Sequence, residues 1–312
     1  MTDACKRDDH GNFVAHYGSF ELRTAYQPIF RLTRRSVDSY GFEGLIRVLT
    51  ARGQKLRPDH FFPLVSPADR FMVENMCREL HFRNMARFSD LPSVLFVNFD
   101  PSVYDDRVVT DAEIDRVEAL TEEVGIAPDR IVCEITEKRA RSEGSLLFLV
   151  ERLRGSGFRI AIDDYGADDS DAERIRTVSP NIVKFDAAWI KRLLETPPGY
   201  NLLRTMVQQF HELGIETLFE GLEERWQLDL ASEMGVTMAQ GFILARPELA
   251  PSNFADLWVR DRSEAFKMSD APLPEPVKAP NPFEPRVFEN EEHYESDTLL
   301  AYKRGHFGRR AG

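Results

Sequence analysis

Short apolar runs recur along the chain, and each ends on a polar residue that is unusual for a buried strand. Runs of about four to eight apolar residues bounded by turn residues are typical of β-strands. We predict strands at residues 39–47, 94–100, 130–136, 158–164, 181–186, 216–221 and 237–242. A helical period predicts helices at residues 67–88, 112–125, 142–157, 202–214 and 223–235. Alternation of helix and strand indicates a parallel sheet covered by helices.

Several of the predicted helices end in glycine just before the next strand, at Gly125, Gly157, Gly214 and Gly235. Glycine is the usual residue at a helix end that leads into a short connection. Together the repeating units span residues 21–267. About 250 residues is the usual size of one barrel of this kind. We therefore predict a single α/β domain with the (β/α)8 TIM-like barrel fold.

The two ends of the chain differ in composition from the predicted barrel. Residues 1–20 are polar and mixed in charge, and we expect a mobile N-terminal arm. Residues 268–312 begin with a run of prolines, which disfavours helix and central strand, and continue with an acidic and then a basic segment. We predict a proline-rich linker and a disordered tail, either solvated or docked to a protein partner.

Charge and composition exclude several classes of protein. A net charge of −12 over 312 residues disfavours general binding of DNA and of anionic membranes. No stretch of about 18 apolar residues occurs, and the first residues lack the apolar core of a signal peptide. The three cysteines have no CxxC spacing, which is typical of a reduced compartment. These observations predict a cytoplasmic protein.

The polar residues at the predicted strand ends form the candidate site. In a barrel of parallel strands the C-terminal ends meet at one rim, so these side chains would converge. Two carboxylates about 4 Å apart repel by roughly 4 kcal/mol at an effective dielectric constant of 20, so a cation is needed among them. An all-oxygen set favours hard divalent ions such as Mg²⁺ or Mn²⁺. The strand-end residues are Glu43, Asn98, Glu134, Asp163, Asp164, Lys184, Glu220 and Gln240.

Asp163 and Asp164 are adjacent, which suits a pair of metal ions. Successive strand residues point to opposite faces, so both can face one site only where the strand ends and the backbone bends. Gly166 follows closely and allows such a bend. Sites with two metal ions typically hydrolyse phosphate esters.

The order and content of these segments resemble the EAL family of cyclic di-GMP phosphodiesterases over residues 26–247. The resemblance extends over many motifs, which makes it more specific than one short signature. The matching segments are AYQPIF, FEGLIR, VNFDP, CEITE, IDDYG, IVKFD, FEGLE and AQGFILARP. This resemblance implies a barrel that hydrolyses one phosphodiester bond of cyclic di-GMP to give linear pGpG.

The resemblance also implies a role for each matching residue. Two Mg²⁺ or Mn²⁺ ions would be held by Glu43, Asn98, Glu134, Asp163, Asp164 and Glu220, with Asp163 bridging the two. Lys184 would contact the attacking water and act in catalysis together with Glu43 and Asp164. Gln27, Arg47 and Gln240 would contact the dinucleotide, and Glu137 and Glu223 would support the ligands. A homodimer is a further expectation.

Two segments depart from the family pattern, and the second of them leaves alternatives open. Gly44 replaces the alanine of the EAL motif, and the loop after Asp164 reads DDYGADDSDAERI where the family usually has DDFGTGYSSL. Three readings follow: an active phosphodiesterase, a weakly active or inactive cyclic di-GMP receptor, and a protein-interaction module. Outside the site, Trp226 and Phe210 have helical spacing among apolar neighbours, and we expect both to lie in the core.

Overall fold

The computed structural model describes residues 5–33, 36–88, 92–136, 140, 142–166 and 171–250. The strands are β1 (Cys5–Arg7), β2 (Phe13–Tyr17), β3 (Phe20–Leu32), β4 (Val37–Leu49), β5 (Lys55–Leu56), β6 (Val94–Phe99), β7 (Ile131–Ile135), β8 (Arg159–Tyr165), β9 (Ile182–Phe185), β10 (Glu216–Phe219), β11 (Met238–Ala239) and β12 (Glu248–Leu249). The α-helices are α1 (Pro58–Phe61), α2 (Arg70–Met85), α3 (Arg107–Val124), α4 (Glu143–Gly155), α5 (Asp171–Val178), α6 (Ala187–Leu194), α7 (Pro197–Glu212) and α8 (Arg225–Met234). Short 3-10 helices are η1 (Phe62–Leu64), η2 (Ala86–Phe88), η3 (Pro101–Val103) and η4 (Pro128–Arg130).

Eight strands close into a barrel, as the sequence predicts. Their order around the ring is β3, β11, β10, β9, β8, β7, β6 and β4, and the ring closes because β3 also pairs with β4. The strands from β4 to β11 pair in parallel at each step of the ring. The helices between them place their apolar sides against the sheet. The barrel expectation is therefore confirmed.

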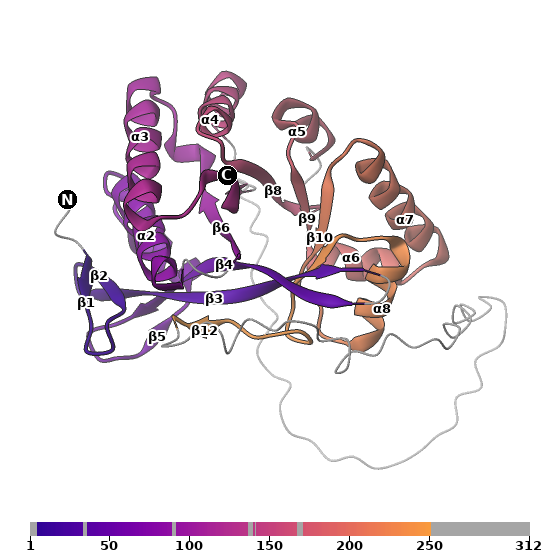
Figure 1. Ribbon diagram of the computed structural model, residues 1–312, viewed down its shortest axis with the longest axis horizontal. Helices are drawn as coiled ribbons and strands as arrows, with labels where there is room; N and C mark the ends of the chain where they lie inside the picture. The colour runs from indigo at the N-terminus through magenta and orange to yellow at the C-terminus, as the bar shows by residue number, and fades with distance from the viewer. Residues whose placement is uncertain are drawn as a thin grey trace, which may run out of the picture. The chain divides into compact units, whose positions relative to one another are not determined.

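One strand of the ring departs from the all-parallel pattern. β3 runs antiparallel to both of its neighbours, β4 and β11. Residues 33–36 separate β3 from β4, and the backbone N–H of Thr33 donates to the carbonyl of Ser36 at 3.0 Å. So short a connection can join only an antiparallel pair. Figure 1 shows these two strands as the longest ribbons of the sheet, with α2, α3, α4, α5 and α7 following one another around the other strands.

The N-terminal residues differ from the expected mobile arm. Residues 5–7 and 13–17 form β1 and β2, an antiparallel pair that continues onto β3. Ala15 of β2 is fully buried and packs with Leu22 and Ile46 in a small apolar cluster. A polar segment with few apolar residues gives a weak strand signal, and pairing with the edge of β3 supplies the missing hydrogen bonds.

Local signals explain where the helices begin and end. The carboxylate of Asp106 accepts hydrogen bonds from the backbone N–H groups of Val108 and Val109, which caps the start of α3. Gly125 follows α3 with a φ angle of 70°, a conformation that glycine adopts without strain. The ends of the five predicted helices lie within three residues of the predicted ends, whereas α3 and α7 each begin five residues earlier than predicted.

The largest apolar cluster lies between the barrel and its helices, and Phe210 of α7 belongs to it, as predicted. Trp226 does not, so its predicted core position is wrong. Its side chain is 47% exposed at the start of α8, and its indole N–H donates to Glu224. An apolar residue in the first turn of an amphipathic helix can have the spacing of core residues and still lie outside the part of the helix that packs on the core.

Within the described residues, no helix combines the length and apolar character that a membrane span requires. The predicted proline-rich segment and tail, 268–312, lie outside the described residues.

Candidate active site

The candidate residues follow the inward-facing apolar residues of the barrel strands at a spacing of two positions. The apolar layer inside the barrel takes Phe96 from β6, Val132 from β7, Ile182 from β9 and Leu218 from β10. Side chains two residues apart on a strand point to the same face. The residues two positions further on therefore point to the same interior, above the apolar layer: Asn98, Glu134, Lys184 and Glu220.

The same rule extends to the remaining strands. Ala161 of β8 and Met238 of β11 belong to the apolar layer, and Asp163 and Gln240 follow two residues later. Since β3 runs the opposite way, Gln27 precedes the inward-facing Ile29 by two positions. The barrel therefore collects the predicted residues at one end.

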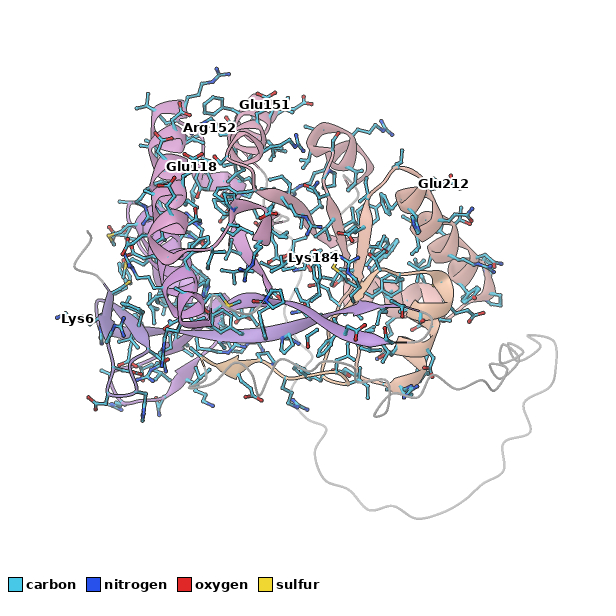
Figure 2. All side chains as sticks on the ribbon, in the orientation of Figure 1. Lys6, Glu118, Glu151, Arg152, Lys184 and Glu212 are labelled. Carbon is cyan, nitrogen blue, oxygen red and sulfur yellow. The ribbon has the colours of Figure 1, made fainter. Side chains whose placement is uncertain are left out.

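Lys184 lies at the centre of this end, among four carboxylates. Its ammonium nitrogen is 2.5 Å from Glu134, 2.8 Å from Asp163, 2.9 Å from Glu220 and 3.9 Å from Glu43, measured to the nearest carboxylate oxygen. Its side chain is 1% exposed. Figure 2 shows Lys184 among the barrel strands, whereas the other labelled residues lie on the outer helices and at the N-terminal end.

The electrostatic balance of this cluster favours further positive charge. Burial alone would lower the pKa of Lys184, but the surrounding carboxylates outweigh it and raise that pKa well above its ordinary value. One ammonium group neutralises only one of four carboxylates. Burial raises the pKa of Glu134 and of Glu220, and the neighbouring carboxylates add to the rise. The excess negative charge is relieved by protons or by metal cations.

The backbone bends at the paired aspartates, as the sequence predicts. Asp164 has a φ angle of 52°, which is rare for a residue other than glycine, and the register of β8 with β9 shifts between Ile162 and Tyr165. The bend brings carboxylate oxygens of Asp163, Asp164 and Glu220 within 4.8 Å of one another. Backbone strain of this kind is typical of functional sites.

A cavity of about 280 Å³ opens above these residues, and Gln27, Glu43, Asp164, Glu220 and Gln240 line it. The side-chain amide of Gln240 donates a hydrogen bond of 2.7 Å to Glu43. Gln27 faces Glu43 across the β3–β4 pair, and its amide donates to the carbonyl of Ala245 at 3.4 Å. The structure therefore brings both glutamines to the carboxylate cluster.

Asn98 and Arg47 lie at a second cavity of about 190 Å³. The guanidinium of Arg47 donates to the carbonyl of Ile46, and burial lowers its pKa, with Glu43 opposing the shift. Asn98 pairs with Glu134 in the register of β6 and β7, which places it at the boundary between the cavity and the carboxylates. These two residues are close to the cluster but outside its ion pairs.

The side chains present fit a divalent metal site. Oε2 of Glu134 and Oε1 of Gln240 are buried and accept no hydrogen bond from any residue in the described part of the chain. Buried oxygens normally have a partner, so unpaired ones at a cluster of acids point to a cation. All donors are oxygens, which suits Mg²⁺ or Mn²⁺ rather than a thiolate site for zinc.

Two lining residues were missed by sequence reasoning. Asp186 lines the larger cavity, and its carboxylate accepts from the backbone N–H of Trp189 at the start of α6. The strand-end rule applied to IVKFD would have found it. His81 of α2 lines the smaller cavity and packs on Gly44. The imidazole occupies the space that the side chain of the family alanine would need.

Some expectations fall outside what the structure describes. Glu137 and the loop at 167–170 lie outside the described residues. Glu223 is described and lines the larger cavity, and its side chain is exposed.

Comparison with curated proteins finds relatives over most of the described region. The chain is 26% identical over 225 residues to the probable cyclic di-GMP phosphodiesterase PdeA of Escherichia coli (strain K12), covering 69% of this chain and 29% of the relative. It is 27% identical over 253 residues to the cyclic di-GMP phosphodiesterase RocR of Pseudomonas aeruginosa, covering 79% of this chain and 60% of RocR. The chain thus spans less than two thirds of either relative.

Solved structures share the fold at low sequence identity. A standalone EAL protein from Vibrio cholerae in its cyclic di-GMP-bound form aligns with a TM-score of 0.64 at 24% identity, covering 75% of this chain and 95% of that one. BlrP1 of Klebsiella pneumoniae in a manganese and cyclic di-GMP complex aligns at 0.63 and 22% identity, covering 73% of this chain and 56% of that one. The family model for the EAL domain matches residues 17–247. The chain therefore belongs to the EAL domain family.

Proposed function

We propose that this chain is a divalent-metal-dependent phosphodiesterase that hydrolyses cyclic di-GMP to linear pGpG. The observation that carries the proposal is the cluster of Glu43, Glu134, Asp163 and Glu220 around Lys184 at one end of the barrel. Family membership and the names of two relatives, both called cyclic di-GMP phosphodiesterases, support the substrate.

Two overlapping groups of these side chains would hold two Mg²⁺ or Mn²⁺ ions. We assign one ion to Glu43, Asn98, Glu134 and Asp163. The second would be held by Asp163, Asp164 and Glu220, each of which has a carboxylate oxygen within 4.8 Å of those of the other two. When bound, such ions lower the pKa of a water molecule and screen charge on the phosphate oxygens.

The chain's own residues hold and orient the reactants. Lys184 keeps its proton, because the surrounding carboxylates raise its pKa, and so can donate a hydrogen bond to an attacking oxygen. Gln27 and Arg47 carry N–H donors that would fix the phosphate, the guanidinium through its planar pair of donors. Water adds its oxygen to phosphorus and gives up one proton, the P–O3′ bond breaks, and the leaving 3′ oxygen takes up one proton, so that cyclic di-GMP and one water give pGpG.

The proposal is tested by incubating the purified protein with cyclic di-GMP and Mg²⁺ or Mn²⁺ and separating the products by ion-exchange chromatography. We expect pGpG, and none when EDTA is present. If the nucleotide stays intact with every metal but binds in calorimetry, the chain is a receptor instead. A homodimer, a partner for the tail and a cytoplasmic location stay predictions.

A further inference from the structure

A buried arginine of the helical layer reaches the end of a strand that carries a predicted metal ligand. Arg78 of α2 has a side chain that is 2% exposed. Its Nη1 group donates a long hydrogen bond of 3.4 Å to the backbone carbonyl of Asn98, and its guanidinium carbon lies 4.4 Å from the ring centroid of Phe99. Asn98 and Phe99 are the last two residues of β6, so one guanidinium contacts both residues at the strand end.

The opposite side of this guanidinium is fixed by partners outside the barrel. Nη2 of Arg78 donates to the hydroxyl of Tyr104 at 2.6 Å and to the carboxylate of Glu113 at 3.1 Å. It also donates to the side-chain amide oxygen of Asn75. Burial alone would lower the pKa of Arg78, but Tyr104 and Glu113 raise it, so the guanidinium stays charged. A buried charge with several partners has little freedom to move.

The pairing of β6 with β4 stops before Asn98. In that ladder the last paired residues are Glu43 and Phe96, whereas pairing with β7 continues through Phe99. The backbone groups of successive strand residues point to opposite edges of the strand. The carbonyl of Phe99 accepts from the N–H of Thr136 on the β7 side, so the carbonyl of Asn98 points to the β4 side. There the guanidinium supplies a donor beyond the end of the ladder.

Placement matters more for Asn98 than for the acidic ligands. Its amide oxygen carries only a partial charge, so it attracts a cation less strongly than a carboxylate and contributes only where its geometry is right. Replacing a group that orients a metal ligand typically lowers metal affinity by about 10–100-fold. The charge of Arg78 is balanced by Glu113 at 3.1 Å. Arg78 can therefore orient a ligand without repelling the ion that the ligand holds.

We propose that Arg78 is a positioning residue for the metal ion that Asn98 would hold, because its guanidinium fixes the end of β6 and directs the Asn98 side chain towards the carboxylate cluster. This inference rests on the proposed function and deepens it. Within the described chain, the hydrogen bonds of Arg78 go to α2, α3, β6 and the residue after η3. The ligands assigned to the second ion come from β8 and from the residue after β10, so Arg78 acts on one ion of the two.

The experiment measures metal binding without substrate, so that it does not depend on turnover. The full chain is treated with EDTA and dialysed, Mn²⁺ is titrated in, and free Mn²⁺ is followed by electron paramagnetic resonance. The variants are Arg78→Lys, Asn98→Ala and the two combined, with circular dichroism as the check on folding. Tyr104→Phe is a milder variant, because it removes one hydrogen bond of the guanidinium and keeps Arg78 in place.

The matched control is Arg83→Lys. Arg83 also lies on α2 and ties it to α3, donating to Glu79 of α2 and to Glu123 of α3. Neither of these partners belongs to a barrel strand. A general loosening of the contact between α2 and α3 would therefore affect this variant as well.

We expect Arg78→Lys to weaken one of the two Mn²⁺ affinities by about 10–100-fold, Tyr104→Phe to weaken it less, and Arg83→Lys to change it by less than about twofold. Because Arg78 acts through Asn98, Arg78→Lys should cause no further loss in the Asn98→Ala background. Turnover of cyclic di-GMP by Arg78→Lys should recover as the Mn²⁺ concentration is raised.

Additive losses in the double variant, or an Arg78→Lys affinity equal to that of the wild type, would overturn the positioning role. If Arg78→Lys does not fold, Tyr104→Phe with and without Asn98→Ala decides by the same comparison. If the wild type binds both ions but leaves cyclic di-GMP intact, the proposed activity fails and the binding cycle still decides the role of Arg78. If the wild type binds no Mn²⁺, both proposals fail.

Discussion

The ammonium nitrogen of Lys184 lies 2.5 Å from a carboxylate oxygen of Glu134, and both side chains are buried inside the barrel. They come from β9 and β7, with β8 and its Asp163 between them. A buried pair of this kind is stable only when further partners balance its charge. The excess of acids around Lys184 therefore leaves negative charge that protons or bound cations must balance.

Replacing Lys184 by methionine tests its part in this balance. We expect turnover to fall by about 10²–10⁴-fold, the usual range for a group that transfers or orients a proton. In EDTA the variant should be less stable than the wild type by about 3–5 kcal/mol, because the buried carboxylates lose their counter charge. Urea unfolding with and without Mn²⁺ measures this. A Mn²⁺ stabilisation no larger than that of the wild type would contradict it.

Replacing Glu43 by alanine should abolish turnover and leave the barrel folded. The carboxylate lies at the rim and accepts from Gln240, and the apolar core does not include it. Activity should drop at least about 10²-fold, with an unchanged circular dichroism spectrum. The matched control is Glu151→Ala, an exposed glutamate on α4. Turnover near the wild-type rate would remove Glu43 from the proposed site.

Restoring the alanine of the EAL motif at position 44 should lower the stability of this chain. A Cβ atom at Gly44 would lie 2.8 Å from Cγ of His81, which is closer than side chains pack. Overpacking in a filled interior costs about 1–3 kcal/mol, so Gly44→Ala should be destabilised by that amount in urea unfolding.

A double-mutant cycle with His81→Ala checks the cause. Removing the imidazole gives the new methyl group room, so Gly44→Ala should cost less in the His81→Ala background. Additive effects would show that His81 is not the reason for the glycine.

His81 also predicts a pH dependence. Burial, with the charges of Arg78 and Arg47, lowers its pKa from 6.5 to about 3, so it stays neutral in the folded chain. A depressed pKa gives stability that is present above about pH 6.5 and is lost as the pH falls towards 3. At pH 5 the loss is roughly 2 kcal/mol. The difference in stability between pH 7 and pH 5 should shrink by that amount in His81→Gln, and an equal difference would contradict the assignment.

The sequence predicts the barrel because its strands and helices alternate with clear periods, and it predicts the acids because each follows an apolar run. It does not predict β1 and β2, whose polar residues pair with a neighbouring strand. It places Trp226 wrongly, because helical spacing alone does not show which apolar residue is covered.

Other parts of the site depend on contacts between distant segments. Gly241, which lines the larger cavity, packs on Leu222, and His81 meets Gly44 across α2 and β4. No local pattern in either segment encodes its partner. Asp186 is different, since it follows an apolar run as the other acids do and could have been predicted by the same rule.

Hydrolysis in water labelled with ¹⁸O tests the central claim most directly. The protein is incubated with cyclic di-GMP and Mn²⁺, and the product is analysed by mass spectrometry. The account predicts pGpG with a single ¹⁸O atom in its 5′-phosphate, no product in EDTA, and little in Ca²⁺, which prefers more ligands and a looser geometry. Product without the label, an equal yield in EDTA, or unchanged cyclic di-GMP with every metal would contradict it.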